Sequence, residues 1–160
     1  MFKPIRIKIN EIDHSAAEAL LQSNRRGIIA MNGVEGYPYA IPINYFYDCD
    51  NKKIYFHGAK SGHKIDAIKN NPKVSISIID QEDVIEEELT TYFRSIILFG
   101  KAKILQGDDE IYQAVNALGL KYCDDEIAVE KEIQREWKAL CCVEIIIEHL
   151  TGKQAIELVK

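Results

Sequence analysis

Short apolar segments separated by tight-turn signals run through most of this 160-residue sequence. GIIAMN (27–32) is followed by NGVEG (32–36), which is typical of a β-hairpin turn, and then by the long strand candidate YPYAIPINYFYD (37–48). DCDNKK (48–53) predicts a second turn before the strand KIYFHG (53–58). Strands that follow one another through such short turns pair in antiparallel order, so the sequence predicts an antiparallel sheet.

Three more strands are predicted after residue 72. KVSISIID (73–80) alternates apolar and polar residues, as a strand does when only one of its faces meets the core. RSIILFGKAKILQ (94–106) is expected to bend at Gly100, and ALCCVEIIIEHL (139–150) is the last strand. The total is six strands, preceded by a short strand candidate at the N-terminus.

Helical periodicity is found between these strands. NEIDHSAAEALLQSN (10–24) predicts a helix capped by Asn10, and a short helix is predicted to begin at Ser61 and to end before Pro72. Two further helical stretches follow the fifth strand. The predicted apolar faces of these three longer helices are Ile12, Ala16, Ala19, Leu20 and Ser23; Ile111, Val115, Leu118 and Tyr122; and Val129, Ile133 and Trp137.

Six strands with peripheral helices predict a mainly β fold, a small six-stranded antiparallel barrel with α segments. The length suits a single domain, 1–160, and no linker or repeat divides it. The net charge of -5 argues against a nucleic-acid surface, and no apolar run is long enough to span a membrane. The N-terminus shows no secretory signal, so we expect a cytoplasmic protein.

The short helix in HGAKSGHKIDAIKNNP (57–72) carries positive charge at its positive end. With Ser61 as the N-cap, His63 and Lys64 would lie among the first three helical positions, where the macrodipole repels a cation. A bound phosphate would reverse this repulsion, because the helix amides and Lys64 would then converge on one anion, with Lys60 as a second cation. The alternative is a solvated lysine whose repulsion is screened. The pattern therefore indicates a candidate anion site.

Two further features lie close to this helix in the sequence. In the strand 37–48, Pro42 cannot donate a backbone hydrogen bond, and the Asn44 amide carries a donor and an acceptor suited to the edge of a planar ring. His57 ends the next strand, and a neutral imidazole there could take part in proton transfer. The alternatives are an ordinary strand with one polar residue facing solvent, and a structural histidine.

Other kinds of site find no support in the sequence. The four histidines do not form a metal-binding set, and no metal is expected. The four cysteines have no CxxC spacing and are expected to be reduced and mostly buried. No GxSxG, GxGxxG or GxxxxGKS/T motif occurs, which argues against a hydrolase nucleophile, a Rossmann site and a P-loop.

The segments GYPYAIPINYFYD (36–48), KIYFHGAKSGHKIDAIKNNPKVSISIID (53–80), RSIILFGKAKIL (94–105) and EHLTGKQAI (148–156) carry a family resemblance. In this order they resemble the pyridoxamine-phosphate-oxidase-like split-barrel flavoproteins, and among these the nitroimidazole-resistance branch. The resemblance covers nearly the whole chain. Its most specific element is the combination of PxN-Y, YFHxAxxGxK and NP at these separations.

The resemblance implies a six-stranded antiparallel split β-barrel that forms a homodimer and binds FMN, or alternatively FAD, at the subunit interface. Each implied flavin contact falls on a residue of this sequence. The flavin ring would be flanked by Pro42, Ile43, Asn44 and Tyr45 and lined by His57 and Gly58, its phosphate would be held by Lys60, Ser61, His63 and Lys64, and the other subunit would contribute Arg94 and Ser95.

The implied activity is that of a flavin-dependent oxidoreductase that reduces a small organic acceptor, nitro compounds among them, with His57 as the candidate catalytic residue. The alternative is a non-catalytic protein that binds flavin or haem. Vitamin B6 oxidase activity is not expected, because relatives with that activity have an arginine-rich FMN strand, and no arginine lies between Arg26 and Arg94 here. They also have a C-terminal substrate-binding extension with Trp and Arg, whereas this chain ends in GKQAIELVK.

Overall fold

A computed structural model describes residues 1–159 of the chain. These residues form eight strands and four α-helices. In chain order the elements are β1 (Glu11–Ile12), α1 (His14–Ser23), β2 (Arg26–Asn32), β3 (Pro38–Asn44), β4 (Phe46–Asp48), β5 (Lys53–Ala59), α2 (His63–Asn70), β6 (Lys73–Ile85), β7 (Thr90–Ile104), α3 (Asp108–Tyr122), α4 (Glu126–Glu136) and β8 (Leu140–Gln154).

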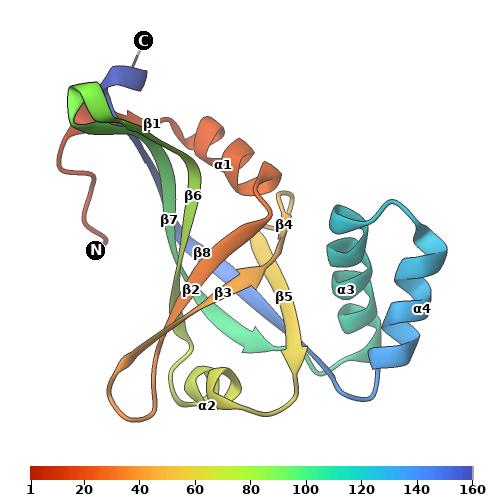
Figure 1. The fold of residues 1–160 in the computed structure, drawn as a ribbon. Helices are drawn as coiled ribbons and strands as arrows, with labels where there is room; N and C mark the ends of the chain where they lie inside the picture. The colour runs from red at the N-terminus through yellow and green to blue at the C-terminus, as the bar shows by residue number, and fades with distance from the viewer. Residues whose placement is uncertain (160) are drawn as a thin grey trace.

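The strands form one curled antiparallel sheet in the order β3-β2-β6-β7-β8-β5-β4, and β1 pairs with β8 (Figure 1). Among the described residues no strand pair joins β3 to β4, so hydrogen bonds do not close the sheet into a complete barrel. This architecture confirms the predicted mainly β antiparallel fold with peripheral helices.

The alternation of residues along the strands places the main core inside the curled sheet. In β6, Val74, Ile76 and Ile78 are buried, while Ser77 on the other face is exposed, as the sequence predicts. The buried side chains of β6 belong to the same apolar cluster as Leu98 of β7 and Ile145 of β8, both fully buried. The core therefore follows from the two-residue period of the strands.

The predicted bend at Gly100 is confirmed. The pairing of β7 with β8 shifts register between Phe99 and Gly100, which marks a β-bulge. A Cβ atom on Gly100 would lie 2.5 Å from the Ile146 carbonyl oxygen, so only glycine allows the two strands this close approach.

A second, smaller apolar cluster holds α3 and α4 against the outside of the sheet. Val115 of α3, Val129 and Ile133 of α4, and Cys142 of β8 pack in it. In Figure 1 the two helices form a hairpin beside β5, α2 lies across one end of the barrel, and α1 lies near the other end. None of the helices formed by residues 1–159 has both the length and the apolar character that a membrane-spanning helix needs.

The prediction that Asn10 caps the first helix is wrong. Glu11 and Ile12 pair with β8 instead, and the Asp13 carboxylate caps α1 by accepting from the Ala16 backbone N–H at 2.9 Å. The helix therefore begins at His14, and its buried residues are Ala17 and Leu21 rather than the predicted stripe of Ile12, Ala16, Ala19, Leu20 and Ser23.

The predicted strand 37–48 is interrupted at Tyr45, which separates β3 from β4. The Tyr45 side chain is fully buried, and its hydroxyl donates to the Leu21 carbonyl oxygen at 2.6 Å. Its backbone N–H donates to the Tyr122 hydroxyl at 3.2 Å rather than to a neighbouring strand. At this residue a hydrogen bond to α3 thus replaces a hydrogen bond between strands.

Candidate functional site

Helix α2 begins one residue later than the sequence predicts. Its N-cap is Gly62 rather than Ser61, and Gly62 has φ of 130°, a backbone conformation that glycine adopts most easily. The N-cap supplies no side-chain acceptor to the first turn. His63 and Lys64 therefore take the first two helical positions, and Asp66 is the first acidic residue of the helix.

Lys64 is half-buried and lies across Gly58 of β5. A Cβ atom on Gly58 would stand 2.8 Å from Lys64 Cε and closer still to Lys64 Nζ. The side chain thus occupies the space that any larger residue at position 58 would fill. The absence of a side chain at Gly58 determines where the Lys64 ammonium lies.

Two more lysines, Lys60 and Lys69, lie within electrostatic range of the same thiol as Lys64. All three ammonium groups act on the buried Cys141 thiol: burial raises its pKa, and the positive charges of Lys64, Lys60 and Lys69 oppose that shift. Within residues 1–159, none of the three lysines forms an ion pair with a carboxylate. In a chain with a net charge of -5, this concentration of unneutralised positive charge favours an anionic ligand.

The first residue of α2 is held against β3. The His63 ring stacks on the Tyr39 ring with centroids 3.9 Å apart and planes 10° from parallel. The start of α2 therefore has contacts with both β3 and β5, and its position relative to these strands is fixed on two sides.

His57 lies in a separate pocket on the outer side of β5, beneath the α3–α4 hairpin. The pocket has a volume of about 380 Å³ and is mostly apolar, with Asn44, Glu132, Glu136 and Tyr122 among its polar lining residues. Partial burial and the positive charge of Lys64 lower the pKa of His57, while Glu136 and Glu132 act in the opposite direction. The imidazole is therefore neutral at pH 7 and able to accept a hydrogen bond or a proton.

The end of α3 is tied to the barrel on one side of this pocket. Lys121 Nζ donates to the carbonyl oxygens of Asn24 at 2.5 Å and Tyr45 at 3.0 Å, and the Tyr122 hydroxyl contacts the Arg25 carbonyl oxygen. Burial, with a smaller contribution from Arg25, lowers the pKa of Lys121 to about 8. The hairpin is thus attached to the barrel by polar contacts as well as by its apolar cluster.

The remaining predicted site residues fall into three groups. Ile43 and Tyr45 point into the core, whereas Pro42 and Asn44 face outward from β3. Ser61 is exposed next to the lysines. Arg94 and Ser95 are not near the lysines in one chain, since Arg94 lines a different pocket with α1 and forms an ion pair with Asp80 at 3.6 Å.

The structure also bears on the cysteines and on metals. All four cysteines are free; Cys141 and Cys142 are buried as predicted, but Cys49 and Cys123 are exposed because they lie in connections outside the strands. In the part of the chain that the structure describes, no group of His, Cys, Asp and Glu side chains has the arrangement of a metal site.

Some site residues escaped the sequence reasoning. Lys69 joins Lys60 and Lys64 only because α2 packs across the end of the barrel, and no local pattern indicates this. Lys121 contacts Tyr45 across a separation of 76 residues, so no short-range signal could have found it.

The charge on Lys64 should be detectable at His57. We expect an NMR titration of the His57 ring to give a midpoint below its ordinary value of 6.5, and we expect Lys64→Ala to raise that midpoint. Removing a nearby positive charge makes protonation easier, which sets the direction of the shift. The control is Lys131→Ala, at an exposed position on α4. An unchanged or lower midpoint in Lys64→Ala would contradict the arrangement described above.

Solved structures with the same fold include three that cover most of this chain. A candidate 5-nitroimidazole antibiotic resistance protein from Bacteroides thetaiotaomicron has a TM-score of 0.73 and 21% identity, covering 90% of this chain and 86% of that one. An FAD-binding protein from Mesorhizobium loti has a TM-score of 0.63 and 19% identity, covering 91% and 96%. A flavocytochrome from Azotobacter vinelandii has a TM-score of 0.74 and 15% identity, covering 96% and 72%.

These similarities confirm the predicted split-barrel fold. Comparison with curated proteins gives no significant match. The sequence itself matches the family described as pyridoxamine 5'-phosphate oxidase over residues 13–154, which is nearly its full length. The chain therefore belongs to the pyridoxamine 5'-phosphate oxidase family.

Proposed function

We propose that the protein is a flavin-dependent oxidoreductase of the nitroimidazole-resistance type, which binds FMN and reduces a small organic acceptor, nitro compounds among them. The observation that carries this proposal is the group of three lysines at the start and along the length of α2, none of them ion-paired within residues 1–159. A flavin phosphate would supply the missing negative charge. Family membership and the flavin-binding relatives support the same reading.

The residues present fit the phosphate end of a flavin. Lys60 and Lys64 offer ammonium donors, Ser61 offers a hydroxyl, and His63 carries the first exposed amide of α2. Gly58 leaves open the space in which the Lys64 side chain lies. FAD carries the same flavin phosphate linkage and is the alternative cofactor at this site.

The residues around the His57 pocket would contact the flavin ring and the electron acceptor. A bound flavin supplies the redox chemistry, by taking two electrons from a donor such as a reduced nicotinamide and passing them on. Asn44 would orient the ring edge through its amide, and Pro42 and the backbone of Ile43 and Tyr45 would lie along the ring. The neutral His57 would hold or donate a proton near the acceptor.

We also propose that two copies of the chain assemble through the outer face of β2, β6 and β7. In this face Ile28 is in register with Ser77, Ser77 with Ile97, and Ile97 with Thr151 of β8. Ile28 and Ile97 remain 44% and 45% exposed in one chain. A face of small and apolar side chains suits a self-complementary contact.

The neighbouring row of the same face supports this surface. Ala40, Ala30, Ser75 and Phe99 are in register there, with small side chains at three of the four positions. In the assembly, Arg94 and Ser95 of the partner subunit would approach the flavin. Their separation from the lysines in one chain is consistent with a site completed by two subunits.

A non-catalytic flavin or haem binder is the second candidate, because the structural relatives include a flavocytochrome. The purified protein distinguishes the two functions. We expect heat-released cofactor to be FMN, its absorbance to bleach with NADH or NADPH, and a nitroimidazole to restore it over many turnovers. Cofactor that bleaches without turnover, or a haem spectrum, would favour the binder. A protein that takes up neither FMN nor FAD would contradict the proposal.

A further inference from the structure

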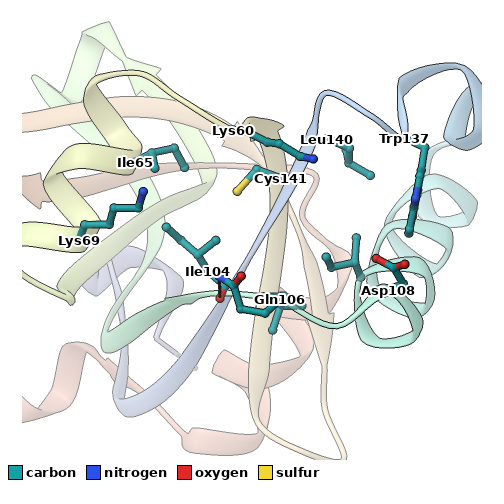
Figure 2. A pocket seen from close by; sticks show the side chains of 11 residues that line it. Lys60, Ile65, Lys69, Ile104, Gln106, Asp108, Trp137, Leu140 and Cys141 are labelled. Carbon is teal, nitrogen blue, oxygen red and sulfur yellow. Dashed lines mark hydrogen bonds between the residues drawn. The ribbon is translucent and has the colours of Figure 1, made fainter.

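A second pocket, of about 320 Å³, lies between α2, the start of α3 and the segment that joins α4 to β8 (Figure 2). Its apolar lining includes Ile65, Ile104 and Leu140. Its charged lining residues are Lys60, Lys69 and Asp108. Lys60 and Lys69 also belong to the lysine group of the proposed flavin site, whereas Asp108 and the apolar lining lie outside it. The pocket therefore extends beyond the phosphate contacts.

The charges are separated across this pocket. Figure 2 shows Lys69 on α2 at one end of the pocket and Asp108 with the Trp137 indole at the other. The Lys60 side chain extends from the segment before α2 toward Leu140, between the two ends. Among residues 1–159, Asp108 forms no ion pair, and neither lysine is paired with it or with any other carboxylate. Positive and negative groups therefore line one cavity without neutralising each other.

Each end of the pocket suits one charged group of a ligand. Two ammonium groups suit a carboxylate, through charge-assisted hydrogen bonds. A carboxylate beside an indole suits an ammonium group, because the ion pair and the cation–π attraction act on the same cation. The apolar residues between them suit an uncharged spacer.

We propose that this pocket binds a small zwitterion whose carboxylate and ammonium groups are separated by a flat or aliphatic spacer, the chemistry of an ω-amino acid. The carboxylate lies toward Lys60 and Lys69, and the ammonium lies toward Asp108 and Trp137. A ligand placed this way brings a group of opposite charge to the lysines and to Asp108 at once, which neither a simple acid nor a simple amine does.

Three probes of the same size test the charge requirement. They are para-(aminomethyl)benzoate, which carries both charges, para-toluate, which has only the carboxylate, and para-methylbenzylamine, which has only the ammonium group. Trp137 is the single tryptophan of the chain, so its fluorescence reports directly on the pocket, with calorimetry as a second measurement. We expect the zwitterion to bind at least roughly tenfold more tightly than either singly charged probe.

Two variants test the orientation of the ligand. Lys69→Met and Asp108→Asn are each expected to weaken zwitterion binding by about tenfold or more, and Asp108→Asn should leave para-toluate binding unchanged or stronger. Both side chains are exposed, so the fold should be retained, and Lys131→Met serves as the surface control. Asp108 lies outside the proposed flavin site, so Asp108→Asn should also keep its flavin content. Equal affinity for zwitterion and toluate, no binding of any probe, or full zwitterion affinity in both variants would overturn the proposal.

Discussion

The Lys64→Ala variant is expected to bind FMN at least about tenfold more weakly than the parent protein. A charge-assisted hydrogen bond contributes about 1.5–3 kcal/mol, which corresponds to a loss of roughly tenfold to more than a hundredfold in affinity. The apoprotein should unfold at nearly the same temperature, because Lys64 is only half-buried and has no ion-pair partner within residues 1–159. Flavin fluorescence during titration of the apoprotein measures the affinity, and a thermal melt checks the fold.

Two further variants show whether the position of the ammonium matters. Gly58→Ala keeps Lys64 but places a Cβ atom where the end of the Lys64 side chain now lies. Because that end is flexible, the fold should tolerate the change while the ammonium moves, and FMN should again bind more weakly. Lys131→Ala on α4 removes a surface lysine of the same charge and should bind FMN normally. Equal affinity in Lys64→Ala and Lys131→Ala would rule out the proposed phosphate contact.

The Ile97→Lys variant is expected to convert a dimer into monomers. Ile97 lies at the centre of the row formed by Ile28, Ser77 and Thr151, and a two-fold contact repeats the substitution on both subunits. Burying an unpaired ammonium costs several kcal/mol, so the dissociation constant of the dimer should rise by at least about a hundredfold. Sedimentation velocity over a range of concentrations measures this change.

The same variant should also retain less flavin. Separation of the subunits removes Arg94 and Ser95 of the partner subunit from the proposed cofactor site. The matched control is Ile127→Lys on α4, where the parent isoleucine is 70% exposed and far in sequence from the sheet face. A parent protein that sediments as a monomer would show that no dimer forms. An Ile97→Lys dimer as stable as the parent dimer would show that the subunits associate through another surface.

The strands could be predicted from the sequence because their signal is local. The alternation of Val74, Ile76 and Ile78 with serines identifies the buried face of β6 without knowledge of its neighbours. Gly100 marks a position where a side chain would collide with the adjacent strand. Patterns of this kind lie within a few residues, so reading them correctly requires no tertiary information.

The helix starts could not be predicted to the residue, because contacts distant in sequence decide them. Glu11 and Ile12 belong to a strand only because β8 lies beside them, and this moves the cap of α1 to Asp13. The start of α2 depends on a positive φ at Gly62. For the candidate site, the run 57–64 supplies Lys60 and Lys64, and its role in cofactor binding stays a prediction. The tie between Lys121 and Tyr45 arises only from packing.

The α3–α4 hairpin has a consequence for how proteins of this fold can vary. Strands β7 and β8 are direct neighbours, and Ile104 is already paired with Val143 where the chain leaves for the helices. A change in the length of the segment between them therefore need not alter the pairing of β7 with β8. This segment lines much of the wall facing His57 but contributes none of the proposed phosphate contacts. Changes in it can therefore reshape the His57 pocket while the proposed phosphate site stays as it is.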